Sequence, residues 1–269
     1  MHGGRGMSLV DRLKRWQAFA VNAATGKPVV FLHIPKCGGT SVGRALRLRY
    51  LLSQNTVHPI HSYRAIKANL PDLGDEELLG VVHEFRQRML AYLISDRTRC
   101  ISAHVPFSKG AWTMAAGEYK FVTILRDPVD RFVSHYFHSL NRDDYSRIEL
   151  SLDEFVRTDR ARRLGSSYVE YLSGLPYGND FSGPAAIAAA VANLEYFDKI
   201  GFLDRLPTFE KDLQTLLGIR LRIRHENVGS HGGVGYRSRL SAETLRIVTE
   251  LCAADIEVYT AARELSNAA

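Results

Sequence analysis

Two short apolar runs, each followed at once by the start of a helix, constrain the fold of this chain more than any other feature. The first run, 29–33, leads through a Gly-containing turn into a helical segment that begins at Thr40. The second, 120–125, leads into Asp127 and Pro128, a favoured N-cap and a favoured first-turn residue of a helix. Because strands that alternate with helices predict a parallel sheet, we expect an α/β fold in which helices flank a central parallel sheet.

The remaining periodic segments add helices and one further strand. Apolar residues recur at helical spacing over 75–93 and over 241–259, which predicts a long helix in each place. Ser151 with a glutamate three residues later forms a capping box, and Pro184 can open the Ala-rich helix that follows it. The run 200–203 is a third candidate strand.

Composition predicts one globular unit. With 269 residues, of which 45% are hydrophobic, the chain can bury one sizeable core, and we expect a single domain over 1–269 with a helical extension over 1–27. No apolar run approaches the roughly 18 residues that span a membrane, and the three cysteines are widely spaced. We therefore expect a cytoplasmic protein. The basic, amphipathic segment 1–27 is the one candidate for membrane contact, and packing on its own domain is the alternative.

The turn after the first run has the composition of an anion-binding loop. Residues 33–41 read HIPKCGGTS. Adjacent glycines let the backbone approach an anion, and N–H groups converge at a helix start. Lys36 adds a positive charge, and the hydroxyls of Thr40 and Ser41 can donate to phosphate oxygens. In nucleotide triphosphatases the lysine follows the glycines, whereas Lys36 precedes them, and this order disfavours magnesium-dependent ATP chemistry.

The second strand-to-helix junction carries a second pair of candidate phosphate ligands. Arg126 ends the strand, and Ser134 follows eight positions later in the helix. With Asp127 as N-cap, Ser134 lies about two turns into the helix, on the face beneath the strand end. An arginine fork and a serine hydroxyl can then close on one phosphate. Arg131, in the same helix, is interpreted as structural.

Taken together, the two segments resemble the 5′-phosphosulfate loop and the 3′-phosphate motif of sulfotransferases that use 3′-phosphoadenosine-5′-phosphosulfate (PAPS). They are most similar to the carbohydrate branch, which includes the heparan and uronosyl 2-O-sulfotransferases. Cys37 stands where that branch usually has threonine, which removes a hydroxyl but leaves the backbone of the loop. The resemblance implies an α/β fold with a P-loop-like, three-layer core, whose central parallel sheet is flanked by helices. It also implies that PAPS is the sulfuryl donor and that it contacts Lys36, Cys37, Gly38, Gly39, Thr40, Ser41, Arg126 and Ser134.

The same resemblance points to a catalytic base. Residues 100–107 read CISAHVPF and are similar to the segment where 2-O-sulfotransferases carry their catalytic histidine, although Ala103 replaces the usual glycine. An imidazole suits proton transfer at neutral pH, so His104 is the candidate base, with a hydrogen-bonded structural histidine as the alternative. His33 is the reserve. Lys36 is expected to stabilise the charge that develops on the bridging oxygen of the leaving group.

The sequence leaves the acceptor open within limits. The resemblance implies a hydroxyl, first of all on a carbohydrate, and the net charge of +6 favours an acidic sugar; a lipid-linked or small natural-product acceptor is the alternative. The rival functions are an ATP-dependent phosphotransferase and a non-catalytic nucleotide-binding protein.

Other partners lack a supporting pattern. The sequence contains no nucleic-acid-binding motif, and nothing in it indicates an oligomeric state. No metal is expected, because the pairs His58 with His61 and His225 with His231 lack further ligands. The basic, Gly-rich segment 227–239 is predicted either to close over the nucleotide or to form a surface loop.

Overall fold

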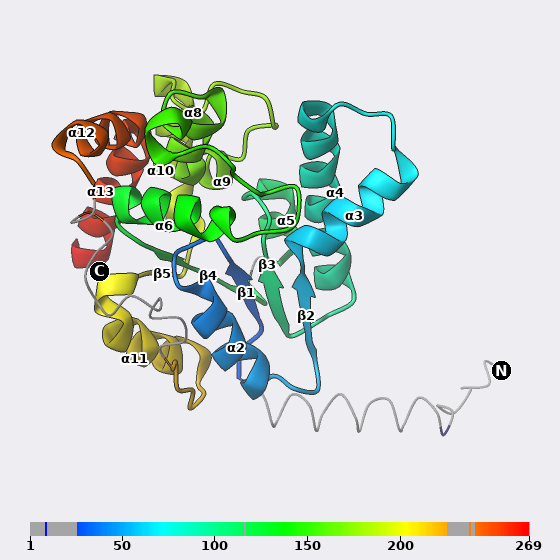
Figure 1. Cartoon of the computed structure of the whole chain (residues 1–269). Helices are drawn as coiled ribbons and strands as arrows, with labels where there is room; N and C mark the ends of the chain where they lie inside the picture. The colour runs from blue at the N-terminus through cyan, green and yellow to red at the C-terminus, as the bar shows by residue number, and fades with distance from the viewer. Residues whose placement is uncertain (1–8, 10–25, 116, 225–236, 238–239, 269) are drawn as a thin grey trace.

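The sheet of the protein is parallel throughout the part of the chain that the structure describes. The computed structural model describes residues 9, 26–115, 117–224, 237 and 240–268, and Figure 1 shows the arrangement. The described strands form one five-stranded sheet in the order β2-β3-β1-β4-β5. They are β1 (Val29–Leu32), β2 (Gln54–Val57), β3 (Cys100–Ala103), β4 (Lys120–Leu125) and β5 (Lys199–Phe202). This confirms the expected α/β fold and its parallel sheet.

The two strongest predicted strands lie side by side at the centre. β1 pairs in parallel with β3 on one side, where Leu32 is opposite Ala103, and with β4 on the other, where Leu32 is opposite Thr123. All four residues of β1 are buried, as expected for a parallel strand covered on both faces. β2 and β3 were not predicted as strands. β2 is an edge strand in which only its last residue, Val57, is buried, so its sequence has no apolar run.

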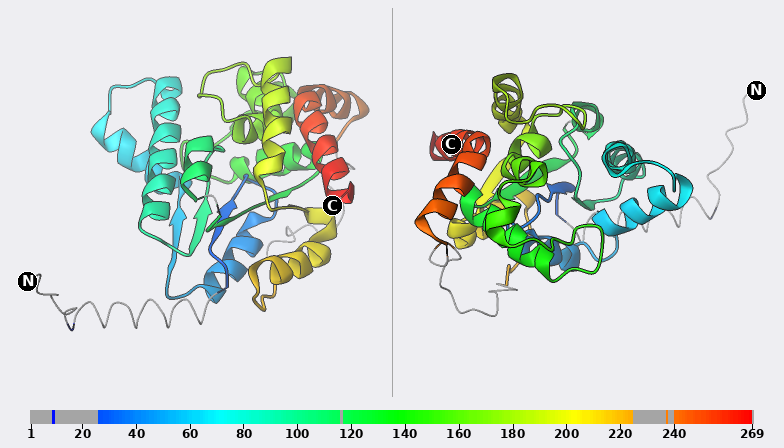
Figure 2. Two further views of the ribbon diagram at one scale, coloured as in Figure 1. Left: turned by 180° about the vertical axis from the view of Figure 1, so that it is seen from behind. Right: turned by 45° about the horizontal axis from the view of Figure 1, so that its top comes forward.

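Helices cover both faces of this sheet. They are α2 (Gly39–Arg49), α3 (Pro59–Asn69), α4 (Asp75–Ser95), α5 (Lys109–Ala115), α6 (Pro128–Leu140), α7 (Leu152–Phe155), α8 (Asp159–Gly165), α9 (Ser167–Leu172), α10 (Pro184–Ala192), α11 (Leu206–Leu217), α12 (Ala242–Leu251) and α13 (Ala253–Ala268), with 3-10 turns η1 (Asn193–Tyr196) and η2 (Leu203–Arg205). In Figure 1, α2 and α11 lie in front of the sheet, and the view from behind in Figure 2 brings α5 and α10 forward.

Local sequence signals explain where several helices begin. The Asp127 side chain accepts the backbone N–H of Asp130 at the start of α6, and Pro128 occupies the first turn. At the start of α7 both hydrogen bonds of the predicted capping box are present between Ser151 and Glu154. Among the described helices none is both long and apolar enough to pass through a membrane.

One predicted helix was wrong in its extent. The segment 241–259 forms two helices, α12 and α13, which meet at Cys252. The break turns Asp255 into the interior, where its carboxylate accepts the backbone N–H groups of Tyr168 at 2.7 Å and Val169 at 3.2 Å and lies 3.5 Å from the Arg131 guanidinium. The apolar period of 241–259 could not show this break, because it carries no information about the contacts that Asp255 makes with distant parts of the chain. Arg131 is thus structural.

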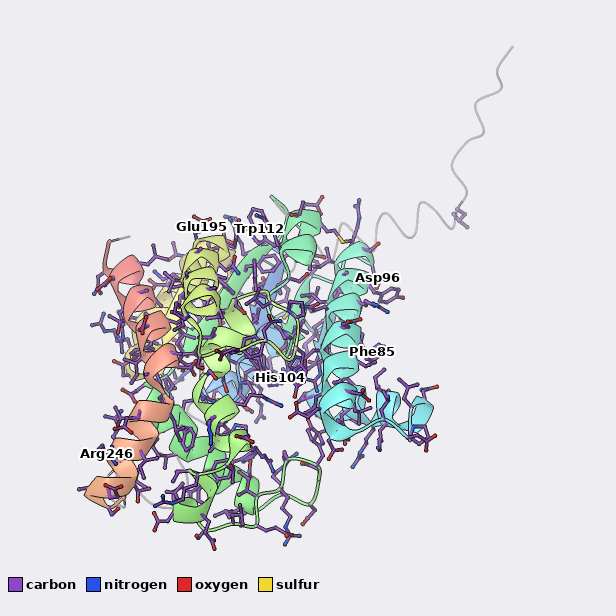
Figure 3. The ribbon with its side chains drawn as sticks, turned by 90° about the horizontal axis from the view of Figure 1, so that it is seen from above. Phe85, Asp96, His104, Trp112, Glu195 and Arg246 are labelled. Atoms are coloured by element: carbon purple, nitrogen blue, oxygen red, sulfur yellow. The ribbon has the colours of Figure 1, made fainter. Side chains whose placement is uncertain are left out.

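The order of the strands brings the predicted site together. β1, β3 and β4 are adjacent and parallel, so the segments that follow them leave the sheet at the same edge. These segments contain the loop 33–38, His104 and Arg126. Ligands of open parallel sheets bind outside this carboxyl edge. Figure 3 looks down onto it and places His104 near the middle of the molecule, with α4, which carries Phe85, to one side.

Candidate active site

The loop between β1 and α2 has a backbone that an ordinary turn would not need. Lys36 has a φ of 68°, and Gly38, the N-cap of α2, has a φ of 79°. A left-handed conformation at a residue with a long side chain costs about 1–2 kcal/mol and persists where the surroundings impose it, often at functional sites. No side chain caps α2, so the positive end of its dipole faces the loop. These features fit an anion.

The two glycines of the loop are required by close packing. A Cβ atom on Gly38 would lie 2.6 Å from Leu203 Cδ1, and one on Gly39 would lie 2.1 Å from His33 Cδ2. His33 therefore covers the first turn of α2 with its ring. This contact gives the reserve base a structural role at the loop.

Cys37 points away from the loop and into the core. Its Sγ lies 3.3 Å from the Tyr168 hydroxyl, and the residue is fully buried. The same hydroxyl accepts the backbone N–H of Arg126 at 2.9 Å. Tyr168 therefore joins the two phosphate motifs, and Cys37 can offer a ligand only its backbone. Sequence reasoning missed Tyr168, which lies far along the chain in a helix without a recognisable pattern.

Cations converge where the two motifs meet. Arg126 is partly buried, and its Nη1 donates to the Lys36 carbonyl oxygen at 3.5 Å. Burial, then the positive charges of Arg126 and Arg142, lower the pKa of Lys36 to about 8. Arg142, which pairs with Asp144, was not predicted. A cluster of like charges at a strained loop favours an anionic ligand, because the ligand relieves their repulsion.

Ser134 is placed by α6 but is not joined to Arg126. It lies two turns into the helix and is largely buried, and among the described residues its hydroxyl makes no hydrogen bond to Arg126.

At the start of the same helix, Asp127 and Asp130 form ion pairs with Arg237. Arg237 is the one residue of the predicted segment 227–239 for which the structure describes a position. The rest of that segment, and all of 1–27 except residues 9, 26 and 27, lie outside the described residues.

His104 lies beside His33 at the end of β3. The two ring centroids are 4.0 Å apart. Burial, followed by the neighbouring His33, lowers the pKa of His104 well below its usual value, and burial with Arg47 lowers that of His33 to about 3. Both imidazoles are therefore neutral at pH 7, and His104 Nδ1 is buried without a hydrogen-bond partner. A neutral imidazole is the form that can accept a proton.

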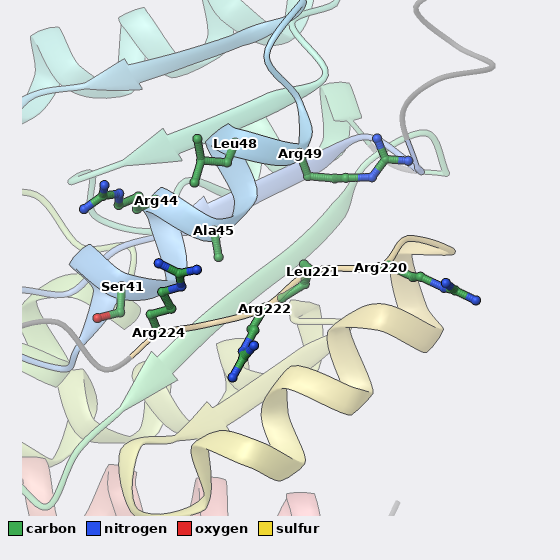
Figure 4. Close-up of a pocket in the computed structure, with 9 residues that line it drawn as sticks. All are labelled: Ser41, Arg44, Ala45, Leu48, Arg49, Arg220, Leu221, Arg222 and Arg224. Atoms are coloured by element: carbon green, nitrogen blue, oxygen red, sulfur yellow. The ribbon is translucent and has the colours of Figure 1, made fainter.

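A strongly basic pocket extends from this loop along α2. It has a volume of about 400 Å³ and is shown in Figure 4. Its lining includes Ser41, in the first turn of α2, and five arginines, Arg44, Arg49, Arg220, Arg222 and Arg224. The last three alternate with buried Leu221 and Ile223. This alternation of arginine with an apolar residue is typical of an extended segment with one basic face, and the sequence analysis did not use it.

A second cavity, of about 410 Å³, reaches the loop at Pro35. One wall comes from α3 and α4 and the other from α6, α8, α9 and the segment 145–148. His135, next to Ser134, lines it, and its Nδ1 is buried without a partner. Sequence reasoning missed His135 too. In the described residues no group of three or more metal-ligating side chains occurs.

Comparisons with known proteins show the family and the fold of the chain. The model of the sulfotransferase family matches residues 21–173, a segment that contains the loop, His104 and both residues of the second motif. A crystal structure of a sulfotransferase from Alicyclobacillus acidocaldarius matches with a TM-score of 0.50 and 17% identity, over 88% of this chain and 96% of that one, which supports the fold. No match was found among curated proteins. Because the family model covers more than half of the 269 residues, the chain belongs to the sulfotransferase family and is a PAPS-dependent enzyme of sulfuryl transfer.

Proposed function

We propose that this enzyme transfers the sulfuryl group of PAPS to a hydroxyl group of a carbohydrate, and that the two motifs hold the donor. The observation that carries the proposal is the meeting of Lys36 and Arg126, two cations from different strand ends, beside an uncapped helix start. The lowered pKa of Lys36 supports the proposal. Neighbouring positive charges disfavour the charged form of the lysine, and a bound anion would compensate for them.

The residues present fit PAPS along its length. The backbone of 36–41 would hold the 5′-phosphosulfate at the start of α2, and Arg126 with Ser134 would hold the 3′-phosphate. Ser41 belongs both to this loop and to the basic pocket, so a nucleotide bound at the loop can extend into the pocket. PAPS supplies the activated sulfuryl group when it is bound.

The chemistry that the chain must provide is proton removal and charge stabilisation. The acceptor oxygen forms a bond to sulfur while the bond from sulfur to the phosphate oxygen breaks. His104, neutral at pH 7, would take the hydroxyl proton. Lys36 would stabilise the negative charge left on the bridging oxygen. Catalysis of this kind depends chiefly on positioning and electrostatics, as in phosphoryl transfer.

The second cavity is the proposed acceptor site. It reaches the loop at Pro35, the residue before Lys36, and shares no lining residue with the basic pocket. Its lining mixes tyrosines with charged and neutral polar side chains, and Tyr63 stacks on Tyr145 with their ring centroids 3.9 Å apart. An aromatic surface beside many hydrogen-bonding groups suits a sugar ring.

Calorimetric titration with adenosine 3′,5′-bisphosphate tests the donor site. We expect wild type to bind it in preference to ATP, and Arg126→Ala to lose about 10- to 100-fold in affinity, which corresponds to about 1.5–3 kcal/mol for charge-assisted hydrogen bonds. Arg88→Ala, which removes a highly exposed arginine of α4, is the matched control. Equal affinity for ATP, or no effect of Arg126→Ala, would contradict the proposed donor.

A further inference from the structure

The second cavity has an unusual charge pattern for a protein with an excess of positive charge. Four arginines line it, Arg86, Arg131, Arg160 and Arg163, and four carboxylates line it with them, Asp75, Glu76, Asp159 and Glu170. The basic pocket along α2, by contrast, includes five arginines and no acid in its lining. The excess positive charge therefore serves the donor side of the loop and gives no reason to expect an anionic acceptor.

Two of the four arginines that line the cavity donate hydrogen bonds to neutral groups. Arg86 donates to Ser62 Oγ at 2.7 Å and to the Pro59 carbonyl oxygen at 2.9 Å, which ties α4 to the start of α3. Arg160 donates from its two terminal nitrogens to the carbonyl oxygens of 146–147 at 2.6 and 2.7 Å. Each of these side chains therefore stabilises one wall of the cavity.

The other two arginines form ion pairs with carboxylates. Arg131 is buried against Asp255, as described above. Arg163 lies 3.6 Å from Glu76 across the cavity and stacks over the ring of Tyr177, 4.7 Å from its centroid. An acidic sugar would compete with these carboxylates for the same guanidinium groups.

A buried carboxylate stands among them. Glu170 is only 7% exposed, and its nearest ionic partners are distant, His83 at 3.8 Å and Arg163 at 3.9 Å. Burial lowers the pKa of His83 to about 3, so at neutral pH this histidine adds no positive charge. A uronate that entered the cavity would meet the buried Glu170 and would compete with it for Arg163, the arginine with which Glu170 pairs.

We infer that the part of the acceptor that enters this cavity is an uncharged, polyhydroxylated ring, a neutral sugar rather than a uronate. The inference rests on the proposed function and specifies its acceptor. Carboxylates accept hydrogen bonds from sugar hydroxyls, and the stacked pair Tyr63 and Tyr145 offers an aromatic surface at the junction of the two walls. In the transfer, one hydroxyl oxygen of this ring would form the bond to sulfur while the bond from sulfur to the bridging phosphate oxygen breaks, and the hydroxyl proton would pass to the general base.

The test compares sugars that differ only at one carbon. Methyl glycosides of glucose, galactose and mannose, each beside its uronate, are added to the complex with adenosine 3′,5′-bisphosphate, and binding is followed by saturation-transfer NMR. Acceptor-dependent release of adenosine 3′,5′-bisphosphate from PAPS is measured in parallel. We expect at least one neutral glycoside to bind and react, about tenfold or more in preference to its uronate. Preference for a uronate, or no binding of any neutral glycoside, overturns the inference.

Variants locate the effect in this cavity. Glu170→Gln should narrow the preference for the neutral sugar, while Glu149→Gln, which changes an exposed carboxylate outside the cavity, should leave it unchanged. Tyr145→Ala alters an exposed side chain, 41% accessible, and should weaken glycoside binding without unfolding the protein; Tyr92→Ala is its control. If adenosine 3′,5′-bisphosphate itself failed to bind, the proposed function would be at fault rather than the acceptor class.

Discussion

The pKa of Lys36 makes donor binding depend on pH in a way that can be calculated. With a pKa of about 8, about 90% of the free enzyme carries the Lys36 charge at pH 7 and about 10% at pH 9. A bound bisphosphate stabilises the ammonium form and moves the pKa back toward its ordinary value of 10.5. Affinity should therefore be level below about pH 7.5 and fall about tenfold per pH unit above pH 8, by at most about 300-fold.

The assay is calorimetric titration of adenosine 3′,5′-bisphosphate between pH 7 and pH 11, above the last ionisation of the phosphates, near pH 6. Lys36→Arg should abolish the bend near pH 8, because a guanidinium stays charged throughout this range. Lys211→Arg, at an exposed position of α11, should keep it. A wild-type affinity that does not change between pH 7 and pH 10, or a bend that persists in Lys36→Arg, would refute the reasoning.

Three further substitutions test separate parts of the site. His104→Ala should lower kcat by about 100- to 10,000-fold and leave donor affinity unchanged, with His138→Ala as control; an equal loss of donor affinity would contradict a role as base. Tyr168→Phe should cost about 1–3 kcal/mol in urea denaturation and weaken donor binding, because a buried N–H at the second motif loses its acceptor; unchanged stability and affinity would oppose the link between the motifs. Gly39→Ala should cost about 1–3 kcal/mol, since its Cβ would overlap a buried ring, whereas Gly43→Ala in the same helix mainly meets the flexible end of an arginine and should stay within about 1 kcal/mol. Equal effects of the two glycine substitutions would contradict the packing.

The parts of the fold that local sequence determines were predictable. β1 and β4 are apolar runs buried by neighbours on both sides, and Asp127 with Pro128 starts α6 through a cap that needs only adjacent residues. β3 was harder to recognise, because four residues that include Ser102 carry little periodic signal even though all are buried. Its pairing with β1 is what makes it a strand.

The candidate site divides in the same way. Lys36, Gly38 and Arg126 belong to contiguous motifs, so the sequence could point to them. Tyr168 could not be found from the sequence, because its role depends on where α9 places its hydroxyl group relative to Cys37 and Arg126. The basic pocket depends on α2 and the segment 220–224 lying side by side (Figure 4), which is a tertiary arrangement.

The charge of the proposed acceptor cavity could not be predicted from the composition of the chain. The net charge of +6 is a sum over the chain and says nothing about where cations are already paired. In the cavity the four arginines are matched by four carboxylates, and the buried one, Glu170, pairs with Arg163, so the local balance differs from the global one. The expectation of an acidic sugar rested on the global value. The proposal of a neutral sugar rests on the local one.

The most direct test of the account is whether the purified enzyme releases adenosine 3′,5′-bisphosphate from PAPS only when a sugar hydroxyl is supplied. We predict release that depends on the glycoside, appearance of the sulfated glycoside in equal amount by mass spectrometry, and loss of both in Lys36→Ala. No reaction with ATP is expected under the same conditions. Consumption of ATP with phosphorylation of the glycoside, or binding of PAPS without transfer to any of the sugars, would contradict it.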